Sequence, residues 1–154
     1  MLVIVIVVAS AWWWLRYRTL KVAGLLTGSY LLTAGVVSAT KRLLARPEPY
    51  EPLEAIGRSF PSGHTAAAIV VWGGIALAYT LSAPKRAAAR FVTTMAITII
   101  VIVASTMVVR SSHWLSDVVA GACVGTAALA TVAAMVGSLR TNPRAAADAA
   151  RRSE

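Results

Sequence analysis

Long stretches without any charged residue dominate this chain. They occupy residues 1–15, 22–40, 65–84, 91–109 and 118–139. A helix that crosses the hydrocarbon core of a bilayer needs roughly 20 apolar residues, and the last four runs reach that length. Because 58% of the chain is hydrophobic and only 14% is charged, its composition is that of a membrane protein. The sequence therefore predicts an all-α, polytopic transmembrane helical bundle of about five spans, with a single domain over 1–139 and a basic cytoplasmic tail over 140–154.

The first run is the shortest and has two interpretations. Its 15 residues are extended by the tryptophans at 12–14, whose rings favour the membrane interface. Ala9, Ser10 and Ala11 also resemble the small-residue cleavage site of a signal peptide. However, no Lys or Arg precedes the apolar run, whereas signal peptides begin with a basic region. This favours a first membrane span.

The basic residues are distributed unevenly between the two ends of the predicted spans. Fifteen Lys and Arg face six Asp and Glu, an excess that would suggest nucleic acid in a soluble protein. Here ten of them follow the first, third and fifth runs: Arg16, Arg18, Lys21, Lys85, Arg86, Arg90, Arg140, Arg144, Arg151 and Arg152. The positive-inside rule then predicts a cytoplasmic C-terminus and an external N-terminus, with no nucleic-acid partner. Both histidine-containing loops would face the outside.

Small residues within the apolar runs indicate close helix packing. Cys123 is the single cysteine, so a disulfide scaffold and a cysteine metal site are both excluded for a monomer. Gly121 and Gly125 form a Gly-x-x-x-Gly pair, and Gly73 and Gly74 lie in an earlier run. Such residues let membrane helices approach closely. We expect packing within the bundle, with a homo-oligomer contact as the alternative.

Each of the two histidines stands just before a long apolar run. In "RSSHWLSD", Arg110 precedes His113, and Asp117 follows four residues later. Ser111 and Ser112 are candidate caps for the next helix. Four residues along a helix place His113 and Asp117 on one face, where the carboxylate can accept a hydrogen bond from one imidazole nitrogen and leave the other free to react. An isolated pair of this kind is more often a polar cap.

The stretch "FPSGHT" at 60–65 is a second polar start of a span. Pro61 ends the preceding element, Ser62 can cap the helix, and Gly63 lets a ligand approach the backbone. Free amides and the helix dipole stabilise an anion at such a terminus. His64 adds a proton donor beside it. An ordinary cap is again the alternative when the stretch is taken alone.

Taken together, these stretches resemble a known family. "KRLLARPEP", "FPSGHT" and "RSSHWLSDVVAG" are similar to the three ordered motifs of the type 2 phosphatidic acid phosphatase family of membrane lipid phosphatases. The order of the motifs and their positions at span ends agree with that family, and the resemblance covers residues 40–125.

The resemblance implies a division of roles among the polar residues. His113 would attack phosphorus and be phosphorylated, Asp117 would orient it, and His64 would protonate the leaving alkoxide. Ser62 and the amide of Gly63 would bind phosphate oxygens. No metal or other cofactor is needed by this scheme, and two histidines with one aspartate would make a poor dedicated metal site.

Two arginines of the family pattern are displaced in this chain. The first motif has a lysine, six residues and then Arg-Pro, but counting from Lys41 reaches Glu48. Arg46 comes two residues earlier. The third motif has an arginine six residues before its histidine, where this chain has Met107, and Arg110 lies three residues later. We hypothesise that Arg46 and Arg110 still reach the site and bind phosphate together with Lys41; the alternative is that they only flank the membrane.

This hypothesis predicts that Arg46→Ala and Arg110→Ala each slow phosphate release, because positive groups must neutralise charge on the equatorial phosphate oxygens. Release of inorganic phosphate from a lipid phosphate measures the effect. Wild-type rates in both variants would contradict it.

The predicted function is removal of a phosphomonoester or diphosphate from a lipid by an integral membrane enzyme. Candidate substrates are phosphatidic acid, phosphatidylglycerol phosphate and polyprenyl-linked phosphates. The richness in Ala, Val and Arg resembles chains of high-GC bacteria, which suggests a bacterial plasma membrane with the site on its outer face. A noncatalytic lipid-phosphate-binding protein with the same fold is the main alternative. A channel or transporter is less favoured, because charge within the apolar runs is nearly absent.

Overall fold

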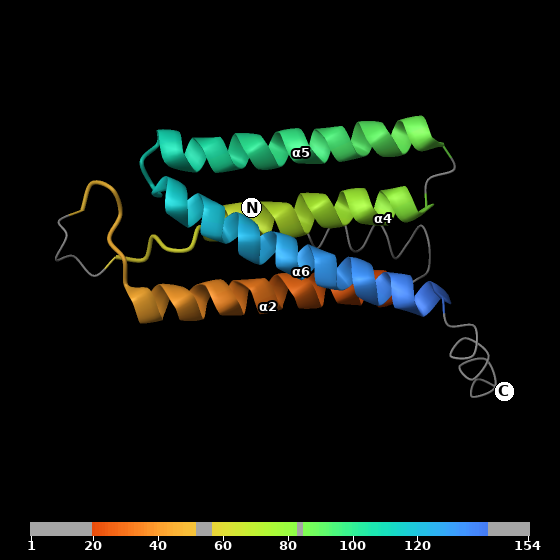
Figure 1. The fold of residues 1–154 in the computed structure, drawn as a ribbon, viewed down its shortest axis with the longest axis horizontal. Coiled ribbons are helices and arrows are strands. Elements are labelled where there is room, and N and C mark those ends of the chain that lie inside the picture. Colours follow the sequence, from red (N-terminus) through yellow and green to blue (C-terminus); the bar gives the residue numbers. More distant parts are fainter. Residues whose placement is uncertain (1–19, 52–56, 83–84, 142–154) are drawn as a thin grey trace.

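The computed structural model describes residues 20–51, 57–82 and 85–141, and these residues form long helices joined by loops (Figure 1). Helix α2 spans Leu20–Leu44. The next helical run comprises α3 (Gly63–Ala68), the π-helix η1 (Ile69–Gly73) and α4 (Gly74–Ser82). It is followed by α5 (Arg86–Val109) and α6 (Leu115–Thr141). The described part of the chain contains no strand, which confirms the all-α class.

Successive helices run in opposite directions, so that polar loops alternate between the two ends of the bundle. Figure 1 shows α2 ending, α3 beginning, α5 ending and α6 beginning at the same end. The end of α4, the start of α5 and the last turn of α6 lie at the opposite end. The three motif-bearing stretches, which are far apart in the sequence, therefore gather at one end.

Within the described residues, three helical segments are long and apolar enough to cross a membrane: Gly63–Leu81, Arg86–Val109 and Leu115–Gly137. They coincide with the last three predicted spans. The predicted span at 22–40 lies within α2, whose 25 residues have sufficient length. The predicted first span lies outside the described residues. The chain is thus a helical membrane protein, and its described residues contain three spans identified by length and composition, whereas about five were predicted for the whole chain.

The core lies where α3 and η1 pack against α6 and α2. Small side chains make this packing close, since Ala66 and Ala68 are fully buried and Val70 is 2% exposed. Helix α5 is more peripheral and buries only Ala96. Several of its large apolar side chains, including Phe91 and Ile102, are exposed, as expected for a surface that faces lipid.

The Gly-x-x-x-Gly pair of α6 is used inside the bundle. A Cβ atom on Gly121 would collide with the backbone carbonyl oxygen of Ser62, and one on Gly125 would lie 2.8 Å from the carbonyl oxygen of Ala66. The backbone of α6 therefore lies directly against the start of α3. This contact also positions Ser62 beside the first turns of α6.

We predict that Gly121→Ala lowers the thermal stability of the detergent-solubilised protein. The added methyl group meets backbone rather than a movable side chain, and overpacking of this kind costs about 1–3 kcal/mol. Gly28→Ala is the matched control, because a Cβ on Gly28 has no neighbour within 4 Å. Equal melting temperatures for the two variants would contradict the close α3–α6 contact.

Candidate active site

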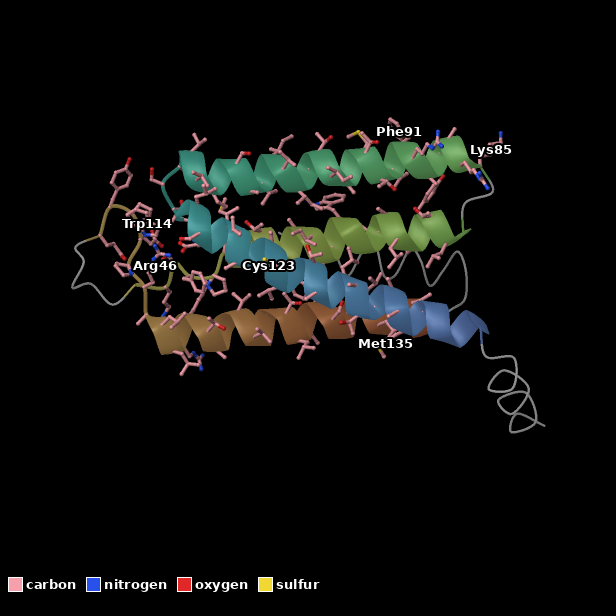
Figure 2. The ribbon with its side chains drawn as sticks, viewed as in Figure 1. Arg46, Lys85, Phe91, Trp114, Cys123 and Met135 are labelled. Atoms are coloured by element: carbon pink, nitrogen blue, oxygen red, sulfur yellow. The ribbon has the colours of Figure 1, made fainter. Side chains whose placement is uncertain are left out.

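The motif residues meet around a buried carboxylate at one end of the bundle. Figure 2 shows Arg46 and Trp114 together at the end where α2 stops and α6 starts, with Lys85 at the other end. Asp117, in the first turn of α6, has no exposed surface. Its Oδ1 accepts a hydrogen bond from Nη1 of Arg46 at 2.9 Å, and its Oδ2 accepts one from the backbone N–H of Trp114 at 3.0 Å.

Asp117 also joins α6 to the start of α3 through its backbone. The backbone N–H of Ser62 donates to the carbonyl oxygen of Asp117 at 2.8 Å. This bond, together with the close approach at Gly121, places the "PSGH" stretch against the residues that follow His113. A buried carboxylate is costly unless it is paired and hydrogen-bonded, and here each of its oxygens has a donor.

His113 lies beside this carboxylate and is only 7% exposed. Its Nδ1 is 3.6 Å from Oδ2 of Asp117, a separation longer than a hydrogen bond. Nδ1 is buried and has no hydrogen-bond partner in the described part of the chain. His113 and Asp117 lie next to each other, as the sequence predicts. The distance between Nδ1 and Oδ2 must shorten by several tenths of an ångström before the two atoms form a hydrogen bond.

The turn that carries His113 differs from the predicted one. Helix α6 begins at Leu115, so His113 precedes the helix rather than sharing a helical face with Asp117. The backbone N–H groups of Ser112 and His113 both donate to the carbonyl oxygen of Met107, at 3.1 and 3.2 Å, which extends the turn after α5.

This longer turn corrects the predicted capping of α6. Ser111 and Ser112 precede the start of the helix by three or four residues, and the Ser111 hydroxyl donates to the Tyr50 hydroxyl at 3.2 Å. The cap is provided instead by Asp117, whose side chain reaches back to the N–H of Trp114. An acidic residue at the third position of a helix often plays this part.

The "PSGH" stretch forms the predicted cap of α3. The Ser62 side chain accepts hydrogen bonds from the N–H of Thr65 at 3.4 Å and from its hydroxyl at 3.0 Å, and Ser62 is fully buried. Gly63 begins the helix with its Cα facing Val37 and the Lys41 side chain. His64 follows and is exposed.

Lys41 extends from the last turn of α2 toward the same loop. Its ammonium group donates to the carbonyl oxygens of Arg58 and Ser59, the latter at 3.3 Å. Lys41 therefore joins α2 to the loop that precedes α3. Its positive charge also lowers the pKa of the His113 imidazole.

The two displaced arginines are placed differently. Helix α2 ends at Leu44, and Ala45 takes a left-handed conformation with φ of 42°, which turns the chain sharply before Arg46. Arg46 then reaches Asp117 and the hydroxyl of Ser116 despite its shortened spacing from Lys41. Arg110 forms the exposed C-cap of α5, and its guanidinium makes no hydrogen bond or ion pair with the described residues.

The motif interpretation missed Trp114. Its indole Nε1–H donates to the carbonyl oxygen of Pro47 at 3.1 Å, and the centroid of its ring lies 5.4 Å from the Arg46 guanidinium carbon. The tryptophan thus joins the loop after α2 to the start of α6. A large aromatic residue directly after a candidate nucleophile was the available signal, but only the tertiary structure shows its partners.

Burial lowers the pKa of His113 below its ordinary value of 6.5, and the positive charge of Lys41 lowers it further, while Asp117 opposes the shift. A lowered pKa keeps the imidazole neutral at physiological pH. A neutral imidazole has a free nitrogen lone pair, which a nucleophile needs. No group of three or more His, Cys, Asp and Glu side chains that could hold a metal gathers within the described ranges.

The lowered pKa of His113 makes stability depend on pH. The unfolded imidazole takes up a proton as the pH falls below 6.5, whereas the folded one resists, so the stabilisation present above pH 6.5 is lost as the pH falls toward the folded pKa. We predict a melting temperature that falls between pH 7.5 and 5.5. His113→Gln should flatten this part of the profile, and an equal fall in both proteins would contradict the assignment.

The fold and the site together define an integral membrane protein with a histidine–aspartate site at one end of its bundle. The family model of the PAP2 superfamily matches residues 22–140, so the chain belongs to the PAP2 superfamily. Proteins of this superfamily are generally phosphatases that act on phosphoric esters. No curated protein and no solved structure matches the chain.

Proposed function

We propose that this protein is a membrane lipid phosphate phosphatase that works through a phosphohistidine on His113. The observation that carries the proposal is the approach of the His113 Nδ1 to the buried Asp117 carboxylate, with Lys41 and His64 close enough to influence the same imidazole. Membership of a phosphatase superfamily supports the reaction class.

In the first step, Nε2 of His113 attacks the phosphorus of the lipid phosphate. The new N–P bond forms as the bond from phosphorus to the lipid oxygen breaks, and His64 gives its proton to the departing alkoxide. Asp117 accepts the hydrogen bond from the Nδ1–H of His113 and stabilises the positive charge that develops on the ring.

In the second step, water attacks the phosphohistidine. The neutral His64 takes a proton from this water, the N–P bond breaks, and inorganic phosphate leaves with His113 restored. His64 is exposed, which is consistent with its role as general acid and base, because it must contact both the leaving lipid alcohol and the incoming water. No step in this scheme requires a metal or other cofactor.

The phosphate oxygens are bound by donors at the same end of the bundle. The ammonium of Lys41, the Ser62 hydroxyl and the Gly63 amide are the proposed ligands, with Arg110 supplying a further charge from the end of α5. A guanidinium in that exposed position has the freedom to turn toward a bound anion.

The substrate is a lipid whose tail stays in the bilayer while its phosphate enters the polar end of the bundle. Phosphatidic acid, phosphatidylglycerol phosphate and polyprenyl monophosphates or diphosphates all have this form. The apolar exposed surface of α5 and α6 is compatible with lateral entry from lipid. Following the distribution of basic residues, we place the site on the outer face of a bacterial plasma membrane, with the C-terminus in the cytoplasm.

The decisive experiment is to trap the phosphorylated protein. Purified protein mixed with a ³²P-labelled lipid phosphate and quenched in alkali, where phosphohistidine survives, should carry label. His113→Ala should carry none and release no phosphate. Asp117→Asn should lower kcat by about 10³- to 10⁴-fold, as expected when the residue that orients a catalytic histidine is lost.

A panel of lipid monophosphates and diphosphates tests the function as a whole. If the wild-type protein releases phosphate from none of them but binds them, the noncatalytic alternative replaces the phosphatase. One observation supports that alternative: Arg46 is hydrogen-bonded to Asp117 and Ser116. The phosphate pocket then has fewer free cations than the family pattern provides.

A further inference from the structure

We propose that Arg46 is a positioning residue for His113 that acts by holding Asp117, and that Trp114 holds Arg46 in place. This role differs from the phosphate-binding role that the motif pattern suggests for this arginine. The inference rests on the proposed function, because it concerns how the nucleophile of that reaction is oriented.

The first support is the way in which the Asp117 carboxylate is fixed. Its two oxygens are held by donors from two different segments: Oδ1 by Arg46 from the loop after α2, and Oδ2 by the N–H of Trp114 at the start of α6. Two donors on opposite oxygens prevent rotation of the carboxylate. The oxygen held by Trp114 is the one that faces Nδ1 of His113.

The second support is that Arg46 is itself anchored. One nitrogen of its guanidinium donates to both Asp117 and the Ser116 hydroxyl, at 2.9 and 2.8 Å. Its backbone carbonyl accepts hydrogen bonds from the N–H and the hydroxyl of Ser59, at 3.0 and 3.2 Å. The loop segment that carries Arg46 is therefore tied down as well as its side chain.

Trp114 completes the arrangement. Its ring lies over the guanidinium at a distance typical of a cation–π contact, and its Nε1–H holds the carbonyl of Pro47, the residue after Arg46. Trp114 therefore makes three contacts: its backbone N–H donates to Asp117, its ring lies over Arg46, and its indole N–H donates to the loop after α2. We refer to Arg46, Trp114 and Asp117 as the clamp.

Charge balance argues against release of Arg46 to a substrate phosphate. Asp117 is completely buried, and a buried carboxylate that loses its cation is strongly disfavoured. A guanidinium that turned toward phosphate would leave Asp117 with one backbone donor and an imidazole 3.6 Å away. Lys41 forms no ion pair with a carboxylate of the described residues, and it stays the better candidate for the phosphate.

Kinetics separate a positioning residue from a phosphate ligand. In Arg46→Ala we expect kcat to fall by about tenfold or more, by analogy with the loss typical when the hydrogen-bonding partner of a metal-binding histidine is removed. The inhibition constant of inorganic phosphate should change less than about twofold, because phosphate contacts are retained. Arg90→Ala, at the opposite end of the bundle, is the matched arginine control and should behave as wild type.

A double variant tests whether Arg46 acts through Asp117. If it does, Arg46→Ala adds no further loss of kcat in an Asp117→Asn background, because residues acting as a unit are not additive. Multiplicative losses, or a phosphate inhibition constant that rises tenfold or more in Arg46→Ala, would overturn the proposal.

A spectroscopic readout does not depend on turnover. The chain has two histidines, so ¹⁵N-histidine labelling gives two imidazole patterns, which His64→Gln assigns. In the wild-type protein at neutral pH we expect the Nδ1–H tautomer of His113, and in Arg46→Ala a mixture of tautomers. An unchanged His113 pattern would refute the clamp even if no lipid substrate were turned over, whereas failure of the proposed function would show only in the release assays.

Trp114→Phe provides a second, milder variant in case Arg46→Ala does not fold. Phenylalanine keeps a ring over the guanidinium but lacks the N–H that holds Pro47. Loss of one hydrogen bond should lower kcat by about two- to tenfold, again with the phosphate inhibition constant unchanged. Wild-type kcat in Trp114→Phe would contradict a role for the indole hydrogen bond to Pro47 in holding Arg46.

Discussion

The burial of one carboxylate organises the polar end of this protein. Asp117 has no exposed surface, so every charge and lone pair that it carries must be satisfied by the chain. The loop after α2 supplies Arg46, the turn before α6 supplies the N–H of Trp114, and the start of α3 is held by the carbonyl of Asp117 itself. Three segments far apart in the sequence meet because one residue requires partners from all of them.

The apolar part of the bundle makes this meeting possible. Glycines of α6 lie against the backbone at Ser62 and Ala66, so α3 approaches α6 more closely than helices with larger side chains could. The small residues of α6 and the buried polar groups at the start of α3 and α6 therefore depend on the same close packing of these two helices. At this polar end, burial and the positive charge of Lys41 lower the pKa of His113.

Several features could be predicted from local patterns. Apolar runs gave the last three spans, because the length needed to cross a bilayer is a property of the chain alone. Ser62 was predicted to cap the third span, and the structure confirms it. The packing of Gly121 and Gly125 inside the bundle is likewise confirmed. The capping of α6 was predicted wrongly, since an extended turn held by the Met107 carbonyl moves the helix start to Leu115.

The sequence by itself determined a helical membrane protein with histidines at the polar ends of spans, and its motifs indicated the superfamily that the family model identifies. Those features depend on residue type and short spacing. Only the tertiary structure decided which side chains meet. Motif spacing predicted that Arg46 is displaced, but after the left-handed turn at Ala45 its side chain binds Asp117. Arg110 is the exposed C-cap of α5 and forms no hydrogen bond or ion pair with the described residues. Contacts between loops depend on how the helices pack, and no spacing along a single segment contains that information.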